Sequence, residues 1–278
     1  MIIAKASPSL LFFDSGLGGL SVYDAVRRKL PHSHAHYFFD HAAFPYGDKS
    51  EAFLIKRVTK LLSSVTGALN VRLVVVACNT ASTIVLPALR ACLSVPVVGT
   101  VPAIKPAALL SQRKVVGLLA TPGTIHRHYT DELIGSFASD CKVLRIGSTS
   151  LVRLAEKHMA GGSVTLEEVA SEVAVWQKLP EEQRPDVVVL GCTHFPLLKD
   201  LLQQALPGTL LLDSGEAIAR RVESLIGLYH LEEVLTGESK GLALHTGTLK
   251  EGFYGTALAR AGFSTPVTVG EDGSLAFT

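Results

Sequence analysis

Two cysteines carry the strongest chemical signal in this 278-residue sequence. Cys78 ends the apolar segment RLVVVA at 72–77, and Cys192 ends the related segment PDVVVLG at 185–191. Ligands of open α/β sheets bind beyond the carboxyl ends of the strands, and the start of a helix favours a thiolate. Two thiols in such related contexts are hard to explain by packing, so we expect both to be reactive groups of one site.

Polar residues follow each cysteine. Asn79 and Thr80 follow Cys78, while Thr193 and His194 follow Cys192. Their side chains can cap the next helix, and the same groups can bind a carboxylate. His194 could also exchange a proton with Cys192 or with a substrate.

The first apolar run leads into Asp14-Ser15-Gly16-Leu17-Gly18-Gly19. This segment is not a dinucleotide fingerprint, because Ser21 stands where the third glycine would be required. No GxxxxGK[ST] phosphate loop is present either. We expect Asp14 to place a carboxylate near a ligand or, alternatively, to cap a helix.

Residue type alone leaves two further segments ambiguous. Pro45-Tyr46-Gly47 is equally typical of a turn and of the rim of a pocket. Glu156 lies in a helical pattern, where an acidic side chain is usually solvated.

Three kinds of chemistry could use these thiols. A Cys–His hydrolase would need one nucleophilic thiol with a base, and zinc would need three or four ligands, for which Cys78, Cys192 and His194 make an unusual set. Two thiols on opposite sides of one carbon suit stereoinversion, in which one removes a proton and the other delivers one. Each general acid or base of this kind typically contributes about 10²–10⁴-fold.

The elements that would position these residues alternate along the chain. Short apolar runs predict strands at 10–13, 35–39, 73–77, 96–98, 115–120, 142–146, 186–190 and 209–212, with helical patterns that include 50–70 and 165–179. The pattern indicates an α/β fold of two pseudo-symmetric, doubly wound parallel-sheet domains, with the active site in the cleft between them. We expect residues 1–98 and 210–278 to form the first domain and residues 99–209 the second.

Composition narrows the classes of partner. Lys and Arg number 26 against 25 Asp and Glu, so no excess of positive charge points to nucleic acid or anionic lipid. No apolar stretch has the length and composition of a signal peptide or a membrane span. We therefore expect a cytoplasmic protein with free thiols, in which Cys92 and Cys141 only fill space in the core.

Four segments together resemble the glutamate racemases, cofactor-independent enzymes that supply D-glutamate for peptidoglycan. They are DSGLGG at 14–19, PYG at 45–47, ACNTAS at 77–82 and GCTHFP at 191–196. The four occur in the order found in that family. The resemblance implies glutamate as substrate, no cofactor and no metal, and it is compatible with a homodimer.

The resemblance also implies roles for individual residues. Cys78 would act on the α-proton of the D-enantiomer and Cys192 on that of the L-enantiomer, with Asp14 tuning Cys78. Glu156 and His194 would assist at Cys192. The residues expected to line the substrate are Asp14, Ser15, Tyr46, Gly47, Asn79, Thr80, Thr121, Thr193 and His194.

Two alternatives stay open beside this interpretation. One is an aspartate or related amino-acid racemase of the same superfamily, and the other is a two-domain protein that binds a small acid without turning it over. Exchange of the α-hydrogen with solvent deuterium separates a racemase from a binding protein.

Overall fold

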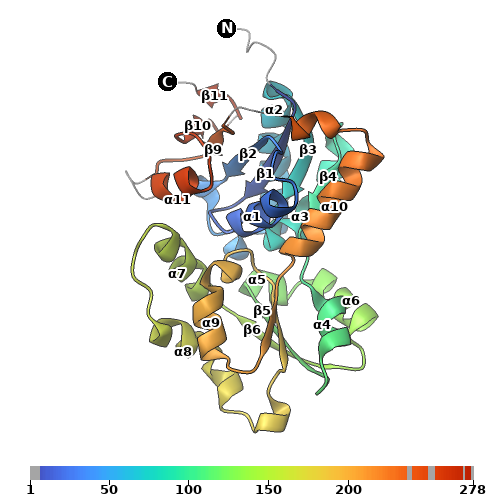
Figure 1. Ribbon diagram of the computed structural model, residues 1–278, viewed down its shortest axis with the longest axis vertical. Helices are drawn as coiled ribbons and strands as arrows, with labels where there is room; N and C mark the ends of the chain where they lie inside the picture. Colours follow the sequence, from blue (N-terminus) through green and yellow to red (C-terminus); the bar gives the residue numbers. More distant parts are fainter. Residues whose placement is uncertain (1–6, 237–239, 250–253, 272, 277–278) are drawn as a thin grey trace.

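The computed structural model describes residues 7–236, 240–249, 254–271 and 273–276 of the chain. Two β-sheets form the centres of two domains that lie one above the other, joined by more than one crossing of the chain (Figure 1). The predicted α/β class with two mainly parallel sheets is confirmed.

The first sheet has the strand order β11-β10-β9-β2-β1-β3-β4, and all of its neighbours are parallel except β10 and β11. Its central strand β1 is buried along its whole length because helices cover both faces. The strands are β1 (Ser9–Asp14), β2 (Ala35–Phe39), β3 (Val71–Val76), β4 (Val97–Gly99), β9 (Ala243–His245), β10 (Val267–Val269) and β11 (Leu275–Ala276).

The second sheet has the order β6-β5-β7-β8 and is parallel throughout. Its strands are β5 (Val115–Ala120), β6 (Lys142–Gly147), β7 (Val187–Leu190) and β8 (Leu210–Leu212). Because β8 pairs with β7, the chain leaves this sheet only after Leu212, beyond the domain boundary expected at 209–210.

Alternate residues of the strands face different layers of helices, as the period of two requires. Leu10 and Phe12 of β1 pack in the cluster under α1, α10 and α11, whereas Leu11 and Phe13 pack in the cluster under α2 and α3. The first-domain helices are α1 (Leu20–Lys29), α2 (Glu51–Ala68), α3 (Asn79–Cys92), α10 (Gly215–Leu228) and α11 (Gly255–Arg260), with short 3₁₀ turns η1 (His41–Ala43), η2 (Tyr46–Asp48) and η5 (Glu232–Leu235).

The second sheet is also covered on both faces. One face packs against α7, α8 and α9, and the other against α4 and α6. The second-domain helices are α4 (Ile104–Leu110), α5 (Pro122–Ile125), α6 (His128–Phe137), α7 (Ser150–Met159), α8 (Leu166–Gln177) and α9 (Lys199–Ala205), with 3₁₀ turns η3 (Glu181–Gln183) and η4 (Phe195–Leu198).

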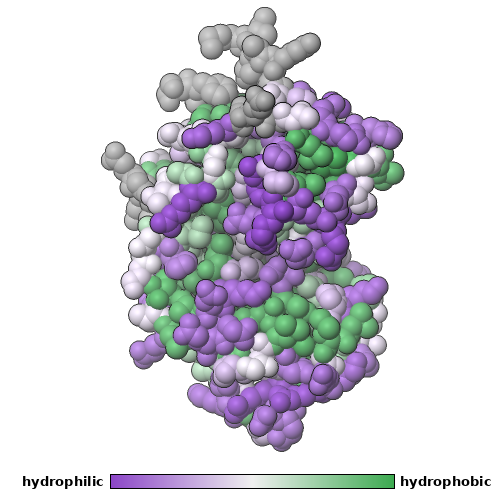
Figure 2. All heavy atoms as spheres, viewed as in Figure 1, coloured by the Kyte–Doolittle hydropathy of each residue, from purple (hydrophilic) through white to green (hydrophobic). Residues whose placement is uncertain are grey.

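Hydrophilic residues cover most of the face shown in Figure 2, with apolar surface over the second domain where α4 lies. Leu109 and Leu110 of α4 and Phe137 of α6 contribute exposed apolar side chains. Among the described residues, no helix is both long and apolar enough to cross a lipid bilayer.

Candidate active site

The two thiols lie at the ends of matching strands in the two domains. Cys78 follows β3 and is the N-cap of α3, where its sulfur accepts a hydrogen bond from the Ala81 N–H at 3.5 Å. Cys192 follows β7, but the next element is the 3₁₀ turn η4 rather than an α-helix. The expectation that both cysteines begin a helix is therefore right for Cys78 and wrong for Cys192, since Pro196 and its neighbours form η4 before α9 begins.

Asp14 lies at the end of β1, wholly buried beside Cys78. Its Oδ1 accepts a hydrogen bond from the Ser15 N–H at 2.6 Å. Its Oδ2 accepts one from the Thr193 hydroxyl at 3.1 Å, so the carboxylate joins the first domain to the second. The sequence prediction that Asp14, Ser15 and Thr193 approach one site agrees with this geometry.

Burial raises the pKa of both Asp14 and Cys78. Burial raises the pKa of Asp14, although the charge of His194 opposes the shift. Burial and the negative charge of Asp14 raise the pKa of Cys78 well above its ordinary value. The charge of Cys192 raises the pKa of Cys78 further, which indicates that the two thiols share one electrostatic environment. Cys78 is therefore protonated near neutral pH.

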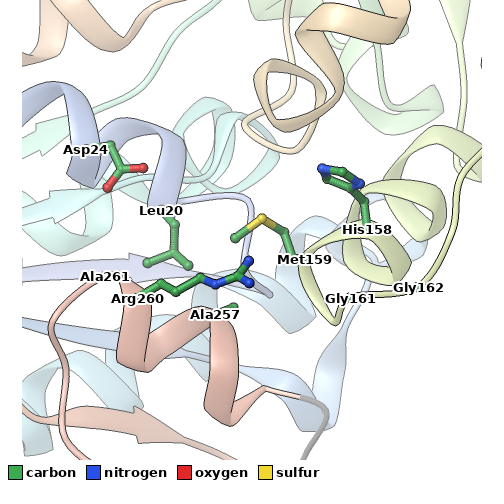
Figure 3. A pocket seen from close by; sticks show the side chains of 9 residues that line it. All are labelled: Leu20, Asp24, His158, Met159, Gly161, Gly162, Ala257, Arg260 and Ala261. Atoms are coloured by element: carbon green, nitrogen blue, oxygen red, sulfur yellow. The ribbon is translucent and has the colours of Figure 1, made fainter.

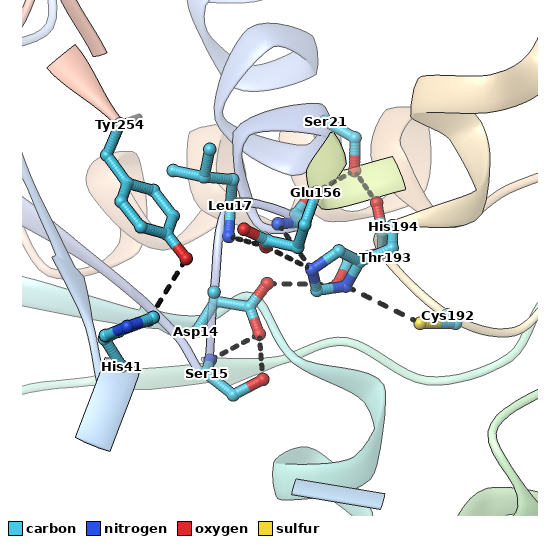
Figure 4. A network of polar contacts seen from close by, with 12 residues as sticks. Asp14, Ser15, Leu17, Ser21, His41, Glu156, Cys192, Thr193, His194 and Tyr254 are labelled. Atoms are coloured by element: carbon cyan, nitrogen blue, oxygen red, sulfur yellow. Dashed lines mark hydrogen bonds and ion pairs between the residues drawn. The ribbon is translucent and has the colours of Figure 1, made fainter. Parts of the chain in front are cut away.

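A second set of groups surrounds Cys192 (Figure 4). His194 Nδ1 lies 3.8 Å from Cys192 Sγ, and His194 Nε2 lies 2.7 Å from Glu156 Oε1. Burial alone would lower the pKa of His194, but hydrogen bonds to Cys192 and Glu156 and their charges raise it well above the ordinary value. The imidazole is thus placed to exchange a proton with Cys192. Glu156 is buried at 4% exposure, not solvated as its residue type alone suggests.

The backbone of the glycine-rich turn after β1 contacts the Glu156–His194 pair. The Leu17 N–H donates to Glu156 Oε1 at 2.6 Å, and the Gly18 amide nitrogen lies 3.2 Å from His194 Nε2. A methyl group at Gly16 would overlap the Glu156 carboxylate, and one at Gly18 would overlap the His194 ring. The glycines are therefore required by close approach of side chains from the other domain.

Three threonines meet on another part of the interface between the domains. Thr80 Oγ1 of α3 lies 3.1 Å from Thr121 Oγ1 and 3.2 Å from Thr124 Oγ1, which come from the second domain. A methyl group at Gly47 would lie 3.1 Å from Thr121 Cβ. The structure thus brings Thr80, Thr121 and Gly47 together as predicted and adds Thr124.

The Tyr46 side chain points into the first domain. It is buried at 1% exposure, and its hydroxyl donates to Asp40 Oδ2 at 2.6 Å. Asp40 also accepts hydrogen bonds from Arg57 Nε at 2.6 Å and Nη2 at 2.7 Å. The phenol of Tyr46 is thus held by Asp40, although its ring shares a buried cluster with Cys78.

A small enclosed space lies beside Cys192. It has a volume of about 10 Å³ and is bordered by Asn79, Thr100 and Thr193, among others. Asn79 Oδ1 and Thr100 Oγ1 are buried and have no hydrogen-bond partner in the described part of the chain. These two atoms can hold polar groups of a ligand. The space itself is too small for an amino acid. The two domains therefore lie in a closed arrangement.

A larger cavity of about 340 Å³ opens at the seam formed by α1, α11 and the end of α7 (Figure 3). Its polar lining includes the charged groups of Asp24 and Arg260 and the imidazole of His158. Neither thiol lines this cavity, so it is separate from the site around Cys78 and Cys192.

The remaining cysteines lie away from this site. Cys92 is exposed and Cys141 is half-buried, so the expectation that both fill the core is wrong. No group of three or more His, Cys, Asp or Glu side chains among the described residues is arranged to hold a metal ion.

Several site residues were absent from the sequence prediction. The Ser21 hydroxyl oxygen lies 2.8 Å from the carbonyl oxygens of both Gly18 and Thr193, so its one hydrogen can bond to either domain. Tyr254 lies near the Glu156 carboxylate, and its hydroxyl is 3.1 Å from His41 Nδ1. Only Thr124 carried a usable signal, since it follows a predicted strand in the segment TPGT.

Comparison with known proteins places this geometry in a family. The family model described as Asp/Glu/Hydantoin racemase matches residues 18–222. A glutamate racemase of Salmonella typhimurium is 56% identical over 224 residues, which are 80% of this chain and 78% of that protein.

Solved structures of glutamate racemases also match this chain over most of its length. An Escherichia coli glutamate racemase in complex with L-glutamate and the activator UDP-MurNAc-ala is 46% identical, with a TM-score of 0.86 over 94% of this chain and 98% of that one. A Thermus thermophilus glutamate racemase in complex with beta-chloro-D-alanine is 31% identical, with a TM-score of 0.72 over 96% of this chain and 97% of that one. The chain belongs to the Asp/Glu/Hydantoin racemase family, among its glutamate racemases.

Proposed function

We propose that this protein interconverts L- and D-glutamate by moving protons between the substrate α-carbon and the thiols of Cys78 and Cys192, and so supplies D-glutamate for peptidoglycan. The observation that carries the proposal is the pair of buried thiols at the ends of β3 and β7, one beside Asp14 and the other beside His194.

In the direction from L- to D-glutamate, the Cys192 thiolate removes the α-proton and becomes a thiol. The electron pair of the broken C–H bond stays on the α-carbon, which becomes planar. The Cys78 thiol then donates its proton to the opposite face and becomes a thiolate. The reverse direction exchanges the two roles, so atoms and charge balance.

The surroundings of the thiols suit the first of these directions. Burial and Asp14 keep Cys78 protonated, ready to donate, while His194 lies 3.8 Å from Cys192 Sγ, where it can exchange a proton with that sulfur. Polar groups of Asn79 and Thr193 border the space beside Cys192 and can bind the substrate carboxylate as negative charge develops. Exclusion of water by the closed domains strengthens each of these interactions.

The test is incubation of the purified protein with L-glutamate in D₂O, followed by chiral chromatography and NMR. We expect an equal mixture of enantiomers with deuterium at the α-carbon, and no comparable turnover of L-aspartate. A binding protein would leave the α-hydrogen in place.

Serine variants of the two thiols test the roles of the sulfurs. Cys78→Ser and Cys192→Ser should each lower racemisation by about 10²–10⁴-fold, because a hydroxyl is a far weaker acid than a thiol. Cys92→Ala is the matched control and should stay within a few-fold of the wild type. Near wild-type turnover in either serine variant would contradict the mechanism.

The proposal extends to the setting of the enzyme. Balanced charge favours a small-molecule substrate over nucleic acid or a membrane, and the proposal is a cytoplasmic enzyme that is compatible with a homodimer. Sedimentation analysis of the purified protein tests the oligomeric state.

A further inference from the structure

The Glu156 carboxylate is only half satisfied by the groups that hold it. Oε1 binds the Leu17 N–H and His194 Nε2, whereas Oε2 is buried and has no hydrogen-bond partner within the described ranges. An unpaired oxygen of a buried carboxylate is costly, so a hydrogen-bond donor at Oε2 would stabilise the carboxylate in this position. A donor that reaches this oxygen would fix the carboxylate and therefore the imidazole that it holds.

Tyr254 is the residue that can supply this donor. It precedes α11 in the C-terminal part of the chain, is 5% exposed, and packs its ring against Phe39 with centroids 5.3 Å apart. Its hydroxyl lies 3.1 Å from His41 Nδ1, and Figure 4 shows the phenol reaching toward the Glu156 carboxylate.

The charge state of these groups is consistent with such a donor. Burial and the negative charge of Glu156 raise the pKa of Tyr254, so the phenol stays protonated across the working pH range. Burial lowers the pKa of His41, which leaves a neutral ring near neutral pH. With the proton on Nδ1, His41 can donate to the phenol oxygen, and the single O–H of Tyr254 is then directed to Glu156.

We propose that Tyr254 is a positioning residue, which binds Glu156 and thereby holds His194 against Cys192. This inference rests on the proposed racemase function and adds a role for the C-terminal segment. Tyr254 belongs to the first domain, whereas Glu156, His194 and Cys192 belong to the second. The base at Cys192 is thus completed only when the domains are closed.

Tyr254→Phe tests the proposal, because it removes the hydroxyl and keeps the ring that packs on Phe39. The two enantiomers have equal free energy, so kcat/KM must fall by the same factor in both directions. We expect a loss of about tenfold, typical of one hydrogen bond to a charged group. Tyr23→Phe is the matched control, since it removes another buried phenol, whose hydroxyl donates to the Ala261 carbonyl at 3.2 Å.

Deuterium isotope effects on kcat/KM distinguish positioning from a general loss of structure. A slower proton transfer at Cys192 should raise the isotope effect for α-deuterated L-glutamate, whose deuteron Cys192 removes. It should lower the effect for α-deuterated D-glutamate, since Cys78 removes that deuteron and protonation by Cys192 then limits the rate.

These opposite shifts in Tyr254→Phe, with none in Tyr23→Phe, are the expected result. Equal or absent shifts in Tyr254→Phe, or shifts of the reverse sign, would overturn the role of Tyr254. That failure is distinct from a failure of the proposed function, in which the wild-type protein itself would not racemise glutamate.

Discussion

Asp14 sets the electrostatics of one half of the site at the cost of an unfavourable burial. It has no exposed surface, and burial raises its pKa because the charged form loses its hydration. The hydrogen bonds from Ser15 and Thr193 offset part of that loss. In return, the carboxylate raises the pKa of Cys78, which keeps a proton available for transfer.

Asp14→Asn should therefore stabilise the protein and impair it as an enzyme. The amide keeps the shape of the side chain and removes the buried charge, so we expect unfolding free energy at pH 7 to rise by about 1 kcal/mol. Racemisation should fall by at least tenfold, because Cys78 loses its charged neighbour. Urea unfolding and chiral assay measure the two effects.

The pH dependence of the gain in unfolding free energy is the control for Asp14→Asn. A raised folded-state pKa means that wild-type Asp14 stabilises the fold at low pH and loses that contribution as pH rises through the folded pKa. The advantage of Asp14→Asn should be small near pH 4 and larger at pH 7. A gain that does not depend on pH would contradict this account.

Residue type and position in the sequence were enough to predict that the thiols, Asp14 and His194 approach one site, because each follows a predicted strand and such ends meet at one edge of a sheet. The role of Glu156 came only from the family resemblance. Its partner Leu17 lies 139 positions away, and no local pattern marks a helical acid as buried. Tyr46 shows the opposite case, in which a predicted site residue directs its side chain into the core.

At the scale of elements, the turn between β1 and α1 is the part most closely fitted to the chemistry. Its backbone N–H groups at Leu17 and Gly18 meet side chains of the second domain. The absence of a side chain at Gly16 and Gly18 lets that approach occur.

Gly18→Ala should lower racemisation by at least tenfold, since the added methyl group would overlap His194 and displace the Glu156–His194 pair. Gly67→Ala is the matched control, because an added methyl group at this position in α2 would contact nothing within 4 Å. That control should keep full activity and gain about 0.5–1 kcal/mol of stability from the better helix former. Equal activity of the two variants would show that the turn does not need its glycine.

The elements that sequence reasoning found lie in continuous apolar or strongly patterned segments. The helix at 165–179 is observed as Leu166–Gln177, and Thr165 and Glu168 form a capping box at its start. The C-terminal strands β9, β10 and β11 were missed, because they are short segments in a Gly-rich part of the chain, whereas the equally short β4 and β8 belong to apolar runs. Pairing with β2 and with each other fixes these strands in the fold.

The whole molecule works through the seam between its domains. Hydrogen bonds cross this seam at Asp14, Leu17, Ser21 and Thr80, and the ion pair of Glu51 in α2 with Arg127 before α6 crosses it nearer the surface. Substrate must separate at least some of these contacts to enter, since the space beside Cys192 is about 10 Å³.

Glu51→Gln tests how far this ion pair, exposed at Glu51 and mostly buried at Arg127, supports closure. A pair with one partner in solvent contributes about 0.2–1 kcal/mol, so kcat/KM at low ionic strength should fall by no more than about fivefold. Salt screens the pair in the wild type, and rising NaCl should therefore bring the wild type toward the variant while changing the variant less. Parallel salt curves for the two proteins would exclude a contribution of this pair to closure.

The burial of both sulfurs has a consequence for chemical damage. Alkylating and oxidising reagents can attack Cys78 or Cys192 only while the two domains are apart, because neither side chain is more than 6% exposed when the domains are closed. The rate of inactivation by a small electrophile therefore reports how often the two domains separate. A saturating inhibitor that keeps the two domains closed should therefore slow inactivation and protect both thiols from chemical modification.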